Sequence, residues 1–306
     1  MKAISLFSGV GGMDMGFERA GIETVLQAER DPWCLEVLAK HWPETERVTD
    51  VRDVQGGRVD LIYGGFPCQD VSVAGKRAGL DGERSGLWFE FERILSELRP
   101  RWAVIENVPG LLSSNKGRDF AVILDGLEDL GYSVGWAVLD AQNFGVPQRR
   151  RRVFIVAGVT GRSVEQVLSL CESCGGNPET SAAPGEAVAG TPDGGAGERD
   201  WSPDTDRMTF VPDLVGALSD GAHHGGGTNG QDAYTGRVFP AVGGVRRLTP
   251  LECERLMGWP DDWTRWTAGG KEIADSHRYR MAGNGVVASV AEWIGHRIVA
   301  VDGGLA

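Results

Sequence analysis

A cysteine directly behind a proline, in the pair Pro67-Cys68, is the clearest sign of chemistry in this sequence. The apolar run Val59–Gly64 precedes it and predicts a buried strand, so Cys68 is expected near the carboxyl end of that strand. Ligands and catalytic groups collect at this end of the strands in open α/β sheets. The proline ring fixes its own φ angle, which stiffens the chain leading to the sulfur. Cys68 is therefore a candidate nucleophile, and burial as a small apolar side chain is the alternative.

A second chemical group, Glu106, follows another apolar run, Ala103–Ile105. A carboxyl group at the end of a buried strand is partly desolvated, which raises its pKa and lets it donate or share a proton. A thiol nucleophile and such a carboxyl group, both at strand ends, suit a covalent mechanism. The alternative is that Glu106 only caps the turn after its strand.

A glycine-rich stretch, Phe7–Gly12, follows the first expected strand and contains Gly9, Gly11 and Gly12. Glycines let the backbone approach a ligand closely, and the first amides of a helix can point at it. The spacing is not the G-x-G-x-x-G of dinucleotide sites. Glu29 ends the second expected strand, where an acid can accept hydrogen bonds from ribose hydroxyls. The stretch thus indicates an adenosine-type cofactor, and a tight turn followed by a surface acid is the alternative.

Strand-like and helix-like segments alternate up to about residue 158. Apolar runs predict strands at Ala3–Phe7, Thr24–Ala28, Leu61–Gly64, Trp102–Ile105, Val134–Leu139 and Val153–Val156. Helical patterns occur at Met13–Ala20, Pro32–His41, Leu87–Leu98, Phe120–Leu130, Thr249–Met257 and Val286–Val301. This alternation predicts an α/β fold with a doubly wound, mostly parallel sheet. A length of 306 residues suggests a core domain with a second, smaller domain.

Charge is unevenly distributed along the chain. The net charge of −12 argues against a simple nucleic-acid binder, which usually presents a basic face. Residues 172–206 contribute much of it, with Arg199 as one base against the acids Glu172, Glu179, Glu186, Asp193, Glu198, Asp200, Asp204 and Asp206. This segment is rich in Gly, Ala, Pro, Ser and Thr and is expected to be a flexible insertion. The run Arg149–Arg152 still predicts a locally basic surface.

Other features bear on location and metals. No stretch approaches the roughly 18 apolar residues of a membrane span, and the amino terminus lacks a cleavable signal architecture. Five scattered cysteines fit a reducing interior, so the protein is expected inside the cell, without membrane contact. Cys171 and Cys174 are spaced like half of a zinc site, but no second pair follows at suitable spacing, so no metal is expected.

Seven motifs in order resemble those of the DNA (cytosine-5) methyltransferases of the prokaryotic and phage type. They are Phe7–Gly12, Gly65–Gln69, Arg84–Trp88, Glu106–Val108, Gln148–Phe154, Arg247–Cys253 and Gly283–Val287. The resemblance covers about residues 1–158 and 246–306. It implies a Rossmann-like catalytic domain that binds S-adenosylmethionine, formed by residues 1–158 and 283–306. Residues 159–282 would form the small target-recognition domain, including the acidic insertion.

The resemblance also implies a mechanism. Cys68 would attack carbon 6 of a cytosine flipped out of the duplex, which makes carbon 5 electron-rich enough to take the methyl group. Glu106 would hold the exocyclic amine and ring nitrogen 3. Arg152 would bind the carbonyl oxygen of the base, and Arg150 would position the active-site arginines or the nearby backbone. A nearby arginine would also lower the pKa of the thiol.

For the cofactor, the resemblance implies a site made from several motifs. Glu29 would take the ribose hydroxyls and Asp50 the adenine amine. The remaining contacts would come from Phe7, Gly9, Gly11, Gly12, Pro67, Leu87, Asn284 and Val286. Gly285 departs from the serine that is commoner in the last motif.

The resemblance further implies double-stranded DNA as the partner of a monomer in the cytoplasm of a bacterial cell or phage-infected host, with a cognate restriction endonuclease as a further partner. Two rival functions stay open. One is an RNA (tRNA) cytosine-5 methyltransferase of the same fold, and the other is a catalytically idle DNA-binding regulator. The residues do not indicate which DNA sequence is recognised.

Overall fold

The computed structural model of the chain describes residues 1–67, 86–159, 161–169, 215–216, 238–241 and 244–304. Cys68 and the acidic insertion at 172–206 lie outside these residues. Among the helices that are described, none is long and apolar enough to cross a membrane.

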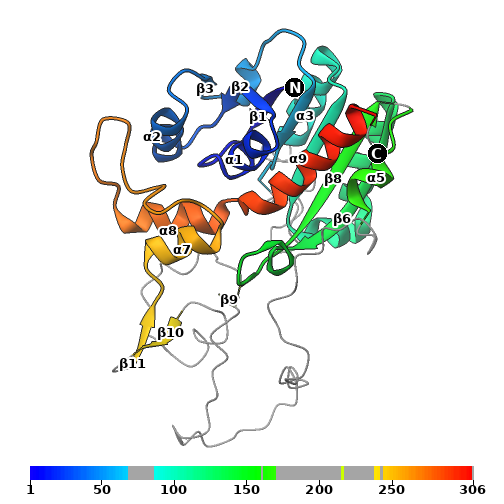
Figure 1. Cartoon of the computed structure of the whole chain (residues 1–306). Coiled ribbons are helices and arrows are strands. Elements are labelled where there is room, and N and C mark those ends of the chain that lie inside the picture. Colours follow the sequence, from blue (N-terminus) through cyan, green and yellow to red (C-terminus); the bar gives the residue numbers. More distant parts are fainter. Residues whose placement is uncertain (68–85, 160, 170–214, 217–237, 242–243, 305–306) are drawn as a thin grey trace, which may run out of the picture.

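A seven-stranded sheet forms the centre of the structure (Figure 1), with the strand order β3-β2-β1-β4-β5-β8-β6. Its strands are β1 (Lys2–Leu6), β2 (Glu23–Ala28), β3 (Glu46–Val48), β4 (Leu61–Gly64), β5 (Trp102–Asn107), β6 (Tyr132–Asp140) and β8 (Arg151–Val159). Strands β1 to β5 pair in parallel, and β8 runs antiparallel to both of its neighbours, β5 and β6. The predicted doubly wound, mostly parallel sheet is confirmed.

Helices cover both faces of this sheet. One apolar cluster joins the sheet to α1 (Gly12–Arg19), α2 (Pro32–His41), α5 (Val164–Leu168) and α9 (Ala288–Asp302). The other cluster joins the opposite face to α3 (Gly86–Leu98) and α4 (Arg118–Asp129). Side chains alternate along β8 between the two clusters, with Phe154 in the first and Val153 in the second, as the strand period of two requires.

Local capping explains why several helices begin where the sequence predicts. Asp31 caps α2 by accepting the backbone N–H groups of Trp33 and Cys34, and Pro32 occupies the first turn. The helix α7 (Pro250–Leu256) begins with a capping box in which Thr249 and Glu252 bond each other's backbone N–H groups. These signals lie within a few residues of chain, so the sequence alone reveals them.

Other elements were not expected from the sequence. The helix α8 (Asp275–Asn284) has no side-chain cap and few apolar residues, and β3 is only three residues long. The remaining short elements are η1 (Val51–Asp53), η2 (Pro109–Gly117), η3 (Ala141–Phe144), β7 (Gln148–Arg149), β9 (Val215–Gly216), β10 (Val238–Ala241) and β11 (Gly244–Arg247). Such elements depend on partners distant in the sequence, which leave no local period.

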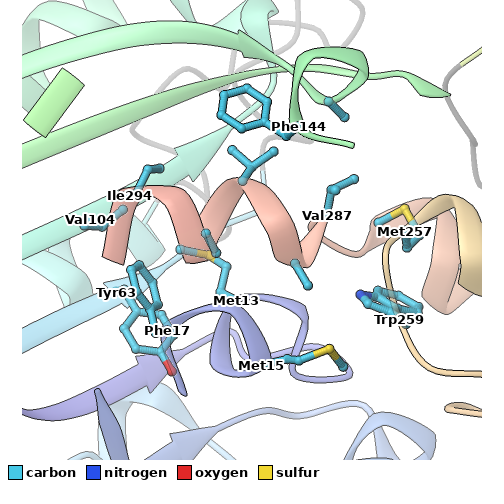
Figure 2. Close-up of a cluster of buried hydrophobic side chains, with 14 of the residues drawn as sticks. Met13, Met15, Phe17, Tyr63, Val104, Phe144, Met257, Trp259, Val287 and Ile294 are labelled. Carbon is cyan, nitrogen blue, oxygen red and sulfur yellow. The ribbon is translucent and has the colours of Figure 1, made fainter. Parts of the chain in front are cut away.

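The last helix packs closely on the first. A Cβ atom on Gly16 of α1 would lie 2.4 Å from the carbonyl oxygen of Ala288, and one on Gly295 of α9 would lie 2.7 Å from the Cβ atom of Ala20. Figure 2 shows α9 running over the residues Met13 and Phe17 of α1. The two glycines therefore let the helix backbones approach, and this contact holds the end of the chain against its beginning.

A buried polar network lies between α1 and the sheet. Asp14 is fully buried and accepts hydrogen bonds from Ser5 Oγ and Gln27 Nε2, each at 2.9 Å. Ser5 and Gln27 are paired neighbours on β1 and β2. Burial raises the pKa of Asp14 to about 6, although the two hydrogen bonds oppose the rise.

The Asp14→Asn substitution is predicted to change how stability depends on pH. The pKa of Asp14 is about 6 in the folded protein, whereas an aspartate in an unfolded chain has a pKa of about 3.9. The folded protein therefore binds the Asp14 proton more tightly than the unfolded chain does. The contribution of Asp14 to the free energy of unfolding is thus largest below about pH 4, falls until about pH 6, and then levels off. The variant lacks this fall, so it should gain up to about 3 kcal/mol relative to the parent between pH 4 and pH 7. Urea unfolding at both pH values measures the gain, and parallel behaviour of the two proteins would contradict it.

The carboxyl-terminal end of α9 is hydrogen-bonded to residues at the start of β5. Asp302 accepts hydrogen bonds from Arg101 Nη1 at 2.5 Å and from the indole of Trp102 at 3.0 Å, and it also pairs with Arg162. The Asp302 side chain is only 10% exposed. Its removal would leave the buried Trp102 N–H without this acceptor.

The Asp302→Asn substitution is predicted to lower the free energy of unfolding by about 2 kcal/mol, because charge-assisted hydrogen bonds are lost from a mostly buried site. Asp261→Asn is a matched control, since the ion pair of Asp261 with Arg255 is exposed on both sides. The control should leave the urea midpoint unchanged. Equal midpoints for the two variants would show that the Asp302 network is not a stabilising contact.

Candidate active site at the carboxyl edge of the sheet

The residues that carry the predicted chemistry come together at one edge of the sheet. Strands β1, β2, β3, β4 and β5 all end there, and the antiparallel β8 begins there. Phe7, Glu29, Asp50, Pro67 and Glu106 follow or end the five parallel strands. Parallel pairing thus places side chains that are up to a hundred residues apart on a common rim.

Glu106 and Arg152 form an ion pair at this rim. Arg152 Nε lies 3.0 Å from Glu106 Oε1, and the two side chains are 18% and 13% exposed. A Cβ atom on Gly65 would lie 2.6 Å from Glu106 Oε2, so a larger residue there would displace this carboxyl group. The chain therefore passes directly against Glu106 three residues before Cys68.

Burial raises the pKa of Glu106, while the charges of Arg152 and Arg150 and the hydrogen bond from Arg152 oppose the rise. A group with these opposing influences can hold or share a proton nearer neutrality than an exposed glutamate. The expectation of a desolvated carboxyl group at this position agrees with the structure.

The four consecutive arginines divide into two sets because a strand presents alternate residues to opposite sides. Arg149 and Arg151 are exposed, whereas Arg150 is 2% exposed and Arg152 faces Glu106. The sequence predicted that the whole run forms a basic surface. Only Arg149 and Arg151 do so, because Arg150 and Arg152 point inward.

Arg150 is bound to the backbone of the last sequence motif. Its Nη2 atom donates to the carbonyl oxygens of Gly283 at 2.8 Å and Gly285 at 2.7 Å. Burial and the nearby charge of Arg152 lower the pKa of Arg150 to about 9, with Glu106 opposing the change. Arg150 therefore stays charged at neutral pH and connects the start of β8 to the segment between α8 and α9.

The approach to the cysteine is held by Asn107. Asn107 Nδ2 donates to the carbonyl oxygen of Phe66 at 3.3 Å, and Phe66 itself is buried. Pro67 is exposed at the rim. Cys68 lies outside the described residues, so its nucleophilic role stays a prediction, but the chain before it is positioned beside Glu106.

Two other cysteines are described, and both are buried. Burial raises the pKa of Cys34 well above its usual range and that of Cys253 to about 12. Thiols of this kind are inert packing groups, since the thiolate is the reactive form. Neither one is a candidate nucleophile.

The glycine stretch forms a left-handed loop after β1. Phe7, Gly9 and Gly11 have φ angles of 54°, 56° and 80°. The N–H of Gly9 donates to Glu29 Oε2 at 2.7 Å, and that of Gly11 donates to the carbonyl oxygen of Ser8. The sequence led us to expect amides that point at a ligand, but these two amides are bound within the protein.

Glu29 joins the loop to the start of α2. Besides the N–H of Gly9, it accepts those of Arg30 at 2.8 Å and Asp31 at 2.7 Å through Oε1. Burial raises its pKa, and these three hydrogen bonds oppose the rise. A carboxylate offers about four acceptor positions, and these three hydrogen bonds leave about one of them over.

Gly11 and Gly12 lack side chains for reasons of packing. A Cβ atom on Gly11 would lie 2.3 Å from the ring of Trp42, and one on Gly12 would lie 2.4 Å from the carbonyl oxygen of Val286. At Gly9 nothing lies within 4 Å of the Cβ position. The open side of the loop is therefore at Gly9, and its closed side is at Gly11 and Gly12.

The other predicted cofactor residues are more scattered. Asp50 accepts the backbone N–H of Arg52 and so caps η1, directly after β3. Leu87 lies half-buried in the first turn of α3, and Asn284 ends α8 as an exposed residue.

The departure at Gly285 has a physical reason. A Cβ atom there would lie 2.5 Å from the ring of Trp259, whose indole N–H donates to the carbonyl oxygen of Val286 at 3.2 Å. The indole thus fills the space that a serine side chain would need. Trp259 and Trp263 are both buried in the core.

The described part of the chain holds no group of three or more His, Cys, Asp or Glu side chains that could bind a metal ion. Cys171 and Cys174 lie outside it.

Comparisons with known proteins agree with this geometry. A family model described as "C-5 cytosine-specific DNA methylase" matches residues 1–174 and 214–300. The chain is 32% identical over 305 residues to the Type II methyltransferase M2.BsuMI of Bacillus subtilis, covering 97% of this chain and 75% of the relative. It is 30% identical over 323 residues to M.Bsp6I of a Bacillus species, covering 97% and 98% of the two chains.

Solved structures share the fold at lower identity. The S. pombe Dnmt2 methyltransferase has a TM-score of 0.65 and 18% identity, over 100% of this chain and 99% of the other. The Entamoeba histolytica methyltransferase EhMeth has a TM-score of 0.66 and 14% identity, over 97% of each chain. The family match, which spans most of the sequence, and the relative of 32% identity show that the chain belongs to the C-5 cytosine-specific DNA methylases.

Proposed function

We propose that this DNA cytosine-5 methyltransferase acts through a covalent bond between Cys68 and carbon 6 of the target cytosine, with S-adenosylmethionine as methyl donor. The observation that carries this proposal is the buried Glu106–Arg152 pair, which lies against Gly65, three residues before Cys68. A thiol entering this site meets a carboxyl group that can share a proton and a guanidinium that can stabilise negative charge.

Addition of the Cys68 thiolate to carbon 6 pushes electron density toward carbon 5 and ring nitrogen 3. Glu106 is suited to hold nitrogen 3 and the exocyclic amine, because its raised pKa lets it share a proton with the ring as charge develops. Arg152 is suited to bind the carbonyl oxygen of the base, at a position that its contact with Glu106 fixes.

When bound, S-adenosylmethionine would supply the methyl group to the electron pair at carbon 5 and would leave as the neutral thioether. Loss of the carbon-5 proton to a base then returns the electron pair, and the bond between the Cys68 sulfur and carbon 6 breaks. Arg150 acts indirectly in this scheme, because its guanidinium holds the backbone of Gly283 and Gly285 beside the site.

Glu29 is the best supported cofactor ligand, since it lies beside the open side of the loop at Gly9 with an acceptor position to spare. Phe7 and Pro67 follow adjacent strands and can border the same space. We assign Asp50 to the adenine amine and Leu87, Asn284 and Val286 to the remaining walls. Gly11 and Gly12 contribute the shape of the loop.

Double-stranded DNA is the proposed substrate, because the matching family is described as a DNA methylase. A monomer is the proposed form of the enzyme. A restriction endonuclease with the same target sequence is a candidate functional partner. The DNA of a bacterial cell or phage-infected host is the proposed setting.

One prediction from this mechanism concerns the nucleophile. Sequencing DNA from an expressing host for 5-methylcytosine identifies the target, and DNA containing 5-fluorocytosine at that target is then mixed with protein and cofactor. The wild type should form a stable adduct, because fluorine at carbon 5 blocks proton loss, and Cys68→Ser should form none. An adduct that survives this substitution would overturn the assignment, and transfer to tRNA instead of DNA would favour the RNA alternative.

Another prediction from this mechanism concerns Glu106. Glu106→Gln keeps the size of the side chain but removes the shared proton, so the rate of methyl transfer should fall by about 100-fold or more. Affinity for S-adenosylmethionine should be unchanged. Glu97→Gln is the control, since Glu97 forms an exposed pair with Arg93 on α3. Full activity of Glu106→Gln would exclude the proposed role.

A further inference from the structure

The closed side of the glycine loop is held by aromatic side chains from outside it. The indole N–H of Trp263 donates to the carbonyl oxygen of Val10 at 2.9 Å, in a buried contact that joins residues 253 apart in sequence. Val10 lies between Gly9 and Gly11, both of which have positive φ angles. This hydrogen bond therefore fixes the orientation of the peptide at the centre of the loop.

Trp263 is in turn fixed by the end of α2. Its ring stacks on that of His41, with centroids 3.4 Å apart and planes at 7°. His41 Nε2 lies 2.9 Å from the backbone carbonyl oxygen of Trp263, which can only accept, so this nitrogen carries the proton. Two contacts thus hold both the ring and the backbone of Trp263 against one side chain.

Neighbouring rings complete the support. Trp42 meets Trp263 edge to face, with centroids 5.5 Å apart, and lies against Gly11. Trp259 bonds the carbonyl oxygen of Val286, which lies against Gly12. The loop is therefore held at three successive residues, Val10, Gly11 and Gly12, by α2 and the segment 259–286.

The open side of the loop depends on this arrangement. The N–H of Gly9 bonds Glu29 Oε2, so a shift at Val10 would also move the partner of the proposed ribose-binding carboxylate. Trp263 itself is directed at the closed side, toward Val10, and makes its contacts with protein groups.

We propose that Trp263 is a positioning residue for the methyl donor, which acts by holding the Val10 carbonyl so that Gly9 and Glu29 keep the geometry that the cofactor requires. This inference rests on the proposed binding of S-adenosylmethionine at that loop. It assigns a cofactor-related role to a residue that the sequence motifs leave unassigned.

The test uses the full chain and three variants. Trp263→Phe keeps a ring for His41 but removes the indole N–H, and His41→Phe keeps the stacking partner but removes the donor to the Trp263 carbonyl. Trp266→Phe is the matched control, because Trp266 packs under Arg265 at 4.9 Å instead of bonding the loop. Circular dichroism establishes the temperature at which each variant is folded.

Calorimetry with S-adenosylmethionine should show the dissociation constant raised about tenfold in Trp263→Phe, as expected when a buried carbonyl loses its donor. His41→Phe should raise it by a smaller factor, and Trp266→Phe should match the wild type. In steady-state assays the KM for the cofactor should rise, while the KM for DNA and kcat at saturating cofactor stay unchanged. A purely structural role would lower the melting temperature without this selective change.

The outcomes separate the two proposals. If the wild type binds no S-adenosylmethionine, the proposed cofactor is wrong and this inference falls with it. If the wild type binds it and folded Trp263→Phe binds it equally well, only the positioning role is overturned. If Trp263→Phe does not fold, the dissociation constant of His41→Phe provides the test. This variant removes a contact that holds Trp263 but keeps the indole N–H of Trp263.

Discussion

Close packing of α9 on α1 is the contact on which the arrangement of the site depends. Gly16 and Gly295 remove the side chains that would hold the two helices apart. Because α1 follows the glycine loop and α9 follows the last motif, their contact brings these two segments to one rim of the sheet. Arg150 then bonds the carbonyl groups of Gly283 and Gly285, and Trp263 bonds that of Val10.

The chemistry at the rim is governed by partial burial of opposite charges. Glu106 and Arg152 are each mostly hidden from solvent and lie 3.0 Å apart. Burial raises the pKa of Glu106, and the positive charges of Arg152 and Arg150 oppose the rise. In the proposed mechanism, a base that enters this site would share a proton with Glu106 beside the guanidinium of Arg152. The buried Cys34 and Cys253 show the contrasting case, in which desolvation is not compensated and the thiol stays protonated.

Much of the fold was predictable from local sequence. The strand at Leu61–Gly64 and the helix at Pro32–His41 lie where apolar runs and the Asp31-Pro32 cap place them. Most candidate residues also lie at the rim, since they follow predicted strands. Helix α8 was missed because it is mostly polar, and β3 because three residues give no period. The local sequence did not indicate the antiparallel direction of β8 either, because that direction follows from pairing with β5 and β6.

The sequence by itself determined which chemical groups are present and that they follow strands, because strand periods, caps and motifs extend over only a few residues. Only the tertiary structure decided which arginines of the run 149–152 point inward, and that Gly11 and Gly12 serve packing whereas Gly9 leaves an open side. It also decided that the indole of Trp263, which is 253 residues from Val10 in the sequence, holds the Val10 carbonyl between Gly9 and Gly11. These properties depend on which distant surfaces meet, and no local pattern encodes that choice.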